Sequence, residues 1–232
     1  YMPSFDIVRE SKPNDSFRVQ SIIGTYDIQQ KNVVEHFCGN IDLPEKWNIG
    51  LIVGRSGGGK STIAKELFGE YLIDKYEYKS QSILDDMPST ASVKEIANAL
   101  TCVGFASPPS WLKPYNVLSN GEKMRCDIAR AMLEKREMVV FDEFTSVVDR
   151  NIARISSLAI QKAVRRKDAK FIAVTCHYDV EEWLMPDWVF NTDDMSFKVI
   201  HKEEQVKKNS ISKFTKPKTK TITGAYLGGI II

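Results

Sequence analysis

Short apolar runs alternate with segments of helical spacing through the middle of the chain. The run WNIGLIVG, residues 47–54, is rich in β-branched residues and predicts a buried strand, and a helical segment, KSTIAKELFGEYL, follows its glycines. Two more buried strands are predicted within EMVVFDEF (137–144) and AKFIAVTCH (169–177). Helical segments from about Gly121 and from about Asn151 to Arg166 precede them. This order of elements predicts a mixed α/β fold.

The segments around this core are less regular. Residues 1–15 are polar and contain two prolines, so we interpret them as an arm or linker before the main domain, residues 16–201. Apolar and polar residues alternate loosely from Phe17 to Ile28, which predicts strands. Residues 82–118 hold four prolines around one helical piece and predict a small helical subdomain. Residues 202–232 are rich in Lys and predict a disordered tail.

Composition narrows the class of protein. The chain has 232 residues and 43% hydrophobic content, enough for one large α/β domain or two small ones. A net charge of +2 makes no case for nucleic-acid binding by the whole molecule, although the basic tail leaves such a contact open. Four cysteines without a CxxC pair predict reduced thiols. With no apolar run of membrane-spanning length and no signal-peptide pattern, the expected location is the cytoplasm.

The strongest motif is GRSGGGKS, which joins the first predicted core strand to its helix. It matches GxxxxGK[ST] in the strand–loop–helix context that this motif requires. Backbone N–H groups of such a loop, together with the helix N-terminus, form an anion site. We expect Lys60 to reach the β- and γ-phosphates of a nucleotide and Ser61 to offer its hydroxyl to Mg²⁺. The predicted phosphate-binding residues are Gly54, Arg55, Ser56, Gly57, Gly58, Gly59, Lys60, Ser61 and Thr62.

A second motif, MVVFDE, ends a buried strand in two acids. Asp142 would lie at the carboxyl end of a central strand, where open α/β sheets bind ligands, and could hold the hydrated Mg²⁺. Glu143 is placed to polarise a water molecule for attack on the γ-phosphate. The alternative is a strand followed by a solvated acidic turn.

A third motif, LSNGE at residues 118–122, stands directly before a helical segment. Ser119 and Glu122 fit a capping box, in which the two side chains satisfy the first N–H groups of a helix. The loop also resembles LSGGQ. A helix N-terminus can serve as a cap and as an anion site at once, so the two interpretations are compatible.

The phosphate loop, LSNGE and the Asp-Glu pair, in this order, resemble the ATP-binding cassette (ABC) ATPases over about residues 17–200. The resemblance implies a P-loop core with an antiparallel β subdomain. It also implies that LSNGE binds the γ-phosphate of ATP held by the other subunit. The residues that it assigns to nucleotide or Mg²⁺ contacts outside the phosphate loop are Ser119, Asn120, Gly121, Glu122, Asp149 of the D-loop, the switch histidine His177, Tyr26 on adenine, and Gln81. Lys60, Glu143 and His177 would be the catalytic set.

Departures from the family pattern are also visible. Asn120 replaces a glycine, and we expect it to be tolerated because Asn adopts left-handed backbone conformations. Glu122 stands where the family has Gln, and Phe144 where it has Pro. The segment before LSNGE is shorter than in transporter subunits, so the resemblance favours stand-alone or acetyltransferase-fused ATPases.

The predicted function is therefore ATP binding and hydrolysis in a head-to-tail homodimer that drives an unknown protein partner. Because the sequence begins with Tyr1, a fused N-terminal domain is left open. A transporter energy subunit with a membrane partner and a soluble nucleic-acid-linked ATPase are the alternatives. A small-molecule P-loop kinase is disfavoured by LSNGE and the Asp-Glu pair.

Overall fold

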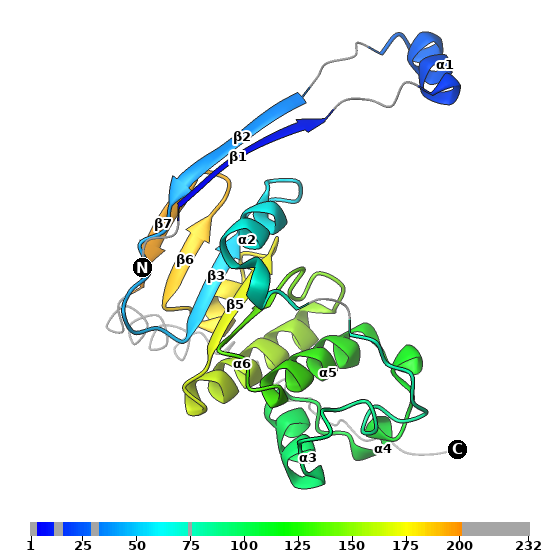
Figure 1. Cartoon of the computed structure of the whole chain (residues 1–232), viewed down its shortest axis with the longest axis vertical. Helices are drawn as coiled ribbons and strands as arrows, with labels where there is room; N and C mark the ends of the chain where they lie inside the picture. Colours follow the sequence, from blue (N-terminus) through cyan, green and yellow to red (C-terminus); the bar gives the residue numbers. More distant parts are fainter. Residues whose placement is uncertain (1–3, 12–15, 29–32, 74–75, 201–232) are drawn as a thin grey trace, which may run out of the picture. The chain divides into compact units, whose positions relative to one another are not determined.

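The computed structural model describes residues 4–11, 16–28, 33–73 and 76–200. Its centre is a five-stranded sheet in the order β4-β5-β3-β6-β7 (Figure 1). The first four strands in this order are parallel, and β7 runs antiparallel to β6. The strands are β3 (Ile49–Val53), β4 (Met138–Phe141), β5 (Lys170–Thr175), β6 (Trp188–Asn191) and β7 (Ser196–Val199).

Alternate residues of the central strand β3 face two different layers. Leu51 and Val53 pack in a cluster with several helices, whereas Ile52 packs on the other face with the helix that follows β3 and with Phe5. Full burial of both faces explains why β3 is apolar throughout. The helices are α2 (Lys60–Phe68) on one face and α3 (Val93–Cys102), α5 (Asn120–Leu133) and α6 (Arg150–Arg166) on the other.

A separate two-stranded ribbon consists of β1 (Ser4–Ser11) and β2 (Val33–Asn40), which pair antiparallel. Part of the segment expected to be a polar arm is thus a strand. Phe5 is 4% exposed and packs edge-on against Phe190 of β6, with ring centroids 5.8 Å apart. This apolar contact fixes the ribbon to the sheet and accounts for a strand in a polar stretch.

The prediction of strands from Phe17 to Ile28 was wrong, because residues Phe17–Tyr26 form the helix α1. Ser16 caps it by accepting a hydrogen bond from the Val19 N–H group at 3.4 Å. Val19, Ile22, Ile23 and Tyr26 have helical spacing, a signal that loose alternation obscured. No residue of α1 is buried.

The region predicted as a small helical subdomain contains α3, α4 (Pro108–Trp111) and the 3₁₀ turn η2 (Tyr115–Val117). Elsewhere a 3₁₀ turn, η1 (Gly69–Tyr71), follows α2, and α7 (Val180–Leu184) follows β5. None of the helices in the described ranges is long and apolar enough to cross a lipid bilayer. The predicted tail, residues 202–232, lies outside the described residues.

Candidate active site

Three neighbouring strands end at one edge of the sheet, and each is followed by a predicted site residue. β3 and β5 are parallel, with Val53 opposite Thr175, and β4 lies on the other side of β5. Gly54 follows β3, Asp142 follows β4, and His177 lies two residues beyond β5. The carboxyl ends of parallel strands form the ligand-binding edge of an open α/β sheet. The fold therefore brings the phosphate loop, the acidic pair and the histidine to the same edge.

The phosphate loop is curled around its own lysine. Lys60, the first residue of α2, is only 7% exposed, and its Nζ donates to the Arg55 carbonyl oxygen at 2.8 Å. The Gly58 N–H group donates to the same oxygen at 3.1 Å. Gly57 and Gly59 have φ values of 80° and 78°, in the left-handed region that glycine adopts readily. The loop thus has the compact form expected of an anion cradle.

Close packing explains two of the glycines. A Cβ atom on Gly54 would lie 2.2 Å from the Thr192 hydroxyl oxygen, and one on Gly59 would lie 2.8 Å from the Phe37 ring. A Cβ atom on Gly57 would meet nothing within 4 Å, so the space beside this residue is open. Thr192 therefore packs against the start of the loop at Gly54, and Phe37 packs against it at Gly59.

The aromatic residue next to the loop is not the one that the sequence pointed to. Tyr26 ends α1 and is 71% exposed, and the segments joining α1 to β1 and β2 lie outside the described residues. The adenine contact of Tyr26 therefore stays a prediction. Phe37 of β2 touches the loop instead. Sequence reasoning missed it because β2 was not predicted.

The loop after β4 has an unusual backbone. Glu143 and Thr145 adopt φ values of 54° and 64°, which are uncommon for residues other than glycine and concentrate at functional sites. Phe144, between them, is fully buried, donates its N–H group to the Val174 carbonyl at 2.8 Å, and packs edge-on against rings of β4 and β5. Proline could not make this hydrogen bond. Phe144 thus anchors the loop and leaves the Glu143 carboxylate exposed.

The LSNGE loop forms the N-terminus of α5, and the capping-box prediction is confirmed. The Glu122 N–H group donates to the Ser119 hydroxyl at 3.3 Å, and this hydroxyl donates to the Glu122 carboxylate at 2.8 Å. Burial opposes the charge on Glu122, but hydrogen bonds from Ser119 hold its pKa below the usual value. Asn120 is not among the described residues with positive φ, so our left-handed explanation for it was wrong. A Cβ atom on Gly121 would lie 2.9 Å from Ile152 of α6.

The remaining predicted residues lie in three separate loops. Asp149 caps α6 by accepting the Asn151 N–H group at 2.8 Å and is exposed. His177 is half-buried, and its N–H group donates to the Thr175 hydroxyl at 3.2 Å. Gln81 is exposed in the segment between α2 and α3. Their roles toward a nucleotide stay predictions.

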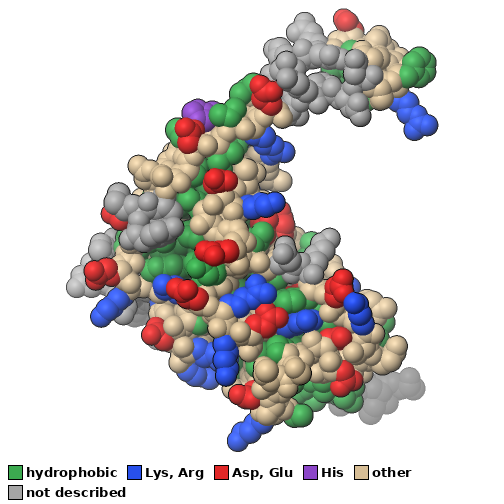
Figure 2. Space-filling view, in the orientation of Figure 1, with side chains coloured by type: hydrophobic (Ala, Val, Ile, Leu, Met, Phe, Trp, Pro, Cys, Tyr) green, Lys and Arg blue, Asp and Glu red, His purple; other side chains and the backbone are tan. Residues whose placement is uncertain are grey.

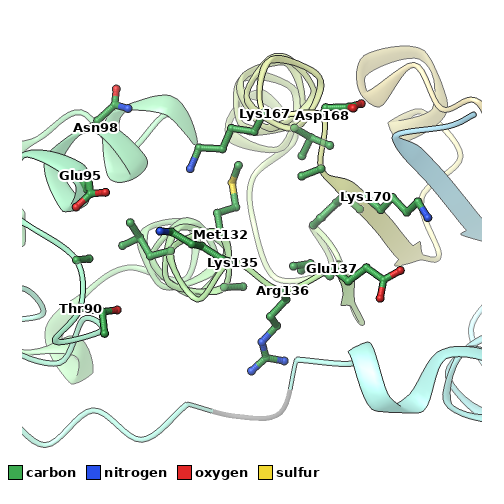
Figure 3. A pocket seen from close by; sticks show the side chains of 17 residues that line it. Thr90, Glu95, Asn98, Met132, Lys135, Arg136, Glu137, Lys167, Asp168 and Lys170 are labelled. Carbon is green, nitrogen blue, oxygen red and sulfur yellow. The ribbon is translucent and has the colours of Figure 1, made fainter.

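A cavity of about 610 Å³ lies at the other edge of the sheet, where β4 and β5 begin (Figure 3). Val139 and Phe171 are among its lining residues. Lys135 and Lys167, at the ends of α5 and α6, also line it. None of the predicted nucleotide residues lines this cavity. The candidate active site is therefore the exposed carboxyl edge of the sheet rather than this hollow.

No protein-family model matches the chain. Curated relatives do. The mRNA export factor elf1 of Schizosaccharomyces pombe is 30% identical over 162 residues, which cover 55% of this chain and 15% of that protein. The putative ATP-binding protein YdiF of Bacillus subtilis is 28% identical over 166 residues, or 62% and 25% of the two chains. The alpha-hemolysin translocation ATP-binding protein HlyB of Escherichia coli O157:H7 is 27% identical over 171 residues, or 53% and 24%. The chain thus spans a quarter or less of these relatives.

Solved structures share the fold. An ATP-binding cassette, solved as a dimer in a post-hydrolysis state with ADP and phosphate, superposes with a TM-score of 0.61. The superposition covers 87% of this chain and 99% of that one, at 13% sequence identity. At so low an identity the superposition establishes the fold alone. It confirms the α/β P-loop architecture with a small antiparallel sheet.

Proposed function

We propose that the chain carries an ATPase domain of the ABC type, which works by closing a head-to-tail dimer around two ATP molecules. The observation that carries this proposal is the meeting of the phosphate loop, the Asp142–Glu143 pair and His177 at one edge of the sheet. The three groups would contact the same triphosphate. We take the phosphate loop, Gly54–Thr62, as the binding element.

Lys60 is the main cation for the phosphates in this proposal. Its Nζ now bonds to a neutral carbonyl oxygen of Arg55, which an anionic phosphate would replace with a stronger, charge-assisted contact. Backbone N–H groups of the loop and the N-terminus of α2 would hold the remaining oxygens. The open space beside Gly57 leaves room for the approach.

Glu143 and His177 would act at the γ-phosphate. The exposed Glu143 carboxylate can accept a hydrogen bond from the attacking water and so orient it. Phe144 anchors the backbone on which Glu143 sits, which keeps the carboxylate in place. His177 would contact the γ-phosphate from the end of β5.

Ser61 and Asp142 fit a Mg²⁺ site. A hydroxyl and a carboxylate are hard oxygen ligands, and Mg²⁺ is usually bound by one or two carboxylates together with substrate phosphates. When bound, Mg²⁺ would neutralise charge on the phosphate oxygens. Gln81 is the third predicted ligand.

The dimer is supported by the surface around LSNGE. Ser119 and Asn120 are exposed at the start of α5, although Gly121 is buried. Val147, two residues before Asp149, is 65% exposed, and Ile152 of α6, which lies beside Gly121, is 36% exposed. Exposed apolar side chains near the N-terminus of α5 suit a face that closes on a second copy. One structural neighbour is itself a dimer with bound nucleotide.

The partner that hydrolysis drives is a protein of unknown identity. A transporter role and a nucleic-acid-linked role are the alternatives, since the relatives include both a translocation protein and an mRNA export factor. On the face seen in Figure 2, acidic and basic side chains are interspersed, so this face has no basic patch for a nucleic-acid backbone. Co-purification separates the alternatives: a membrane protein would indicate a transporter. We propose a cytoplasmic location for the chain.

Lys60→Ala tests the nucleotide assignment. Losing the charge-assisted contact should weaken ATP binding by about 1.5–3 kcal/mol, measured by titration calorimetry. Lys65→Ala, on the same helix, is the matched control and should bind normally. An unchanged affinity in Lys60→Ala would refute the phosphate-loop assignment. Release of free phosphate by the wild type, with no phosphorylated acceptor, distinguishes an ATPase from a kinase.

A further inference from the structure

Asp193, in the turn between β6 and β7, contacts two loops of the candidate active site. Its Oδ1 accepts the Arg55 N–H group of the phosphate loop at 2.9 Å, and the Arg55 Nε lies 3.8 Å away. Its Oδ2 accepts a hydrogen bond from the Tyr178 hydroxyl. Tyr178 directly follows His177. One carboxylate therefore joins the phosphate loop to the histidine segment.

The strand order makes this arrangement a brace across the sheet edge. In the order β5-β3-β6, Tyr178 follows β5, Arg55 follows β3, and Asp193 follows β6. Asp193 thus contacts one residue that follows the central strand β3 and one that follows β5, on the other side of β3.

Backbone hydrogen bonds fix the position of Asp193 in the turn. The Thr192 N–H group donates to the Val53 carbonyl at 2.8 Å, and the Asp193 N–H group donates to Asn191 Oδ1 at 2.9 Å. The same turn places the Thr192 hydroxyl where a Cβ atom on Gly54 would lie. The turn and the phosphate loop are therefore packed as one unit.

Asp193 stays charged in this position. The Tyr178 hydrogen bond, followed by the Arg55 N–H group, lowers the pKa of the carboxyl below its usual value. The hydrogen bond to Asp193 raises the pKa of Tyr178, so its hydroxyl keeps the proton that it donates. Both partners are thus in the protonation states that the contact requires.

We propose that Asp193 is a positioning residue that holds the phosphate loop and the His177 segment at a fixed separation. The carboxylate orients Arg55 through its backbone, and it orients His177 through Tyr178. The proposal rests on the proposed roles of the loop and His177. It assigns Asp193 no contact with the nucleotide.

Three variants separate the two halves of the brace. Tyr178→Phe removes only the hydroxyl and so releases the histidine segment. Asp193→Ala releases both loops. Asp193→Asn loses the charge but keeps a side-chain oxygen for Arg55 and an amide that can pair with Tyr178. Asp194→Ala is the matched control, since its carboxylate accepts bonds from Ser196 at the start of β7 and, among the described residues, none from the phosphate loop or the His177 segment.

The readouts are the ATP dissociation constant and kcat, with thermal unfolding as a check on folding. Tyr178 is 50% exposed, so moderate effects are expected. Tyr178→Phe should keep the wild-type ATP affinity and lose about threefold to tenfold in kcat. Asp193→Ala should raise the ATP dissociation constant and lower kcat, each by a similar factor. Asp193→Asn should recover most of the loss, and Asp194→Ala should match the wild type.

Failure of the brace and failure of the proposed function give different results. If the wild type hydrolyses ATP and Tyr178→Phe keeps full kcat, the brace is refuted and the function stands. Equal losses in Asp193→Ala and Asp194→Ala would also refute it. If the wild type releases no phosphate, the function fails, and nucleotide binding decides the brace. Wild-type affinity for ATP in Asp193→Ala would then refute it.

Discussion

At the scale of single residues, Glu122 sets the charge of the surface that would meet the second ATP. Its carboxylate accepts both the N–H group and the hydroxyl of Ser119, so it caps α5 and occupies the donors that a phosphate would use. The family usually has a neutral Gln at this position. A γ-phosphate approaching this helix N-terminus would have to displace a negative charge of the protein itself.

Glu122→Gln should therefore strengthen ATP-dependent dimerisation. Gln can still cap the helix, and removing a like charge next to the phosphate should lower the ATP concentration for half-maximal dimerisation by about threefold to tenfold. The measurement is an ATP titration followed by light scattering in a Glu143→Gln background. Glu95→Gln is the matched control, because Glu95 forms the same capping box with Ser92 in α3. Equal behaviour of the two variants would contradict the prediction.

Local motifs predicted some site residues, and distant contacts defined the others. Lys60 and Asp142 could be assigned because a loop and a strand end carry their own sequence pattern. The Asp193 contact joins residues 138 positions apart, and no local pattern encodes it. Phe37 lies in the β1–β2 ribbon, which the sequence analysis did not predict. Tyr26 was chosen by its place upstream of the loop, and its adenine contact stays a prediction.

At the scale of elements, a half-buried polar cluster joins the segment between α2 and α3 to α5. The hydroxyls of Tyr78 and Tyr115 donate to Asp127 at 2.9 and 2.7 Å, and the two rings stack with centroids 3.9 Å apart. Burial raises the pKa of Asp127, while these hydroxyls and Arg130 act in the opposite direction. Gln81 belongs to this segment, so its position depends on the cluster.

Tyr78→Phe should destabilise the domain by about 1–3 kcal/mol, because the half-buried Asp127 carboxylate loses one of its two tyrosine donors. Urea unfolding followed by circular dichroism gives the free energy. Tyr26→Phe removes a hydroxyl from an exposed tyrosine and should leave the stability unchanged. A loss below 0.5 kcal/mol, a threshold about the size of ordinary surface effects, would contradict a structural role for the cluster.

Element prediction succeeded where burial enforces a pattern. β3, β4 and β5 are buried runs that end in motifs, and the structure has them where the sequence places them. α1 is exposed on all sides, so no buried face sharpened its period, and helical spacing was mistaken for alternation. β1 depends on its pairing with β2 and on the burial of Phe5, neither of which a local window reveals.

At the scale of the whole molecule, the proposed sites of nucleotide contact lie in different parts of one domain. The phosphate loop and Glu143 share the sheet edge, whereas Ser119 starts a helix that packs with α3 and α6. In a head-to-tail pair, each chain would offer its loop to one ATP and its Ser119 to the other. Binding of the γ-phosphate would then hold the two copies together, and hydrolysis would release them.

The most direct test of this account is the mass of Glu143→Gln with and without ATP and Mg²⁺, measured by size-exclusion chromatography with multi-angle light scattering. Gln keeps the size of the side chain but cannot polarise the water, so ATP should remain intact and hold a dimer. Ser119→Arg in the same background should abolish the dimer and leave ATP binding to the monomer largely unchanged. A Glu143→Gln protein that stays monomeric at saturating ATP, or loss of monomer binding in Ser119→Arg, would contradict the account.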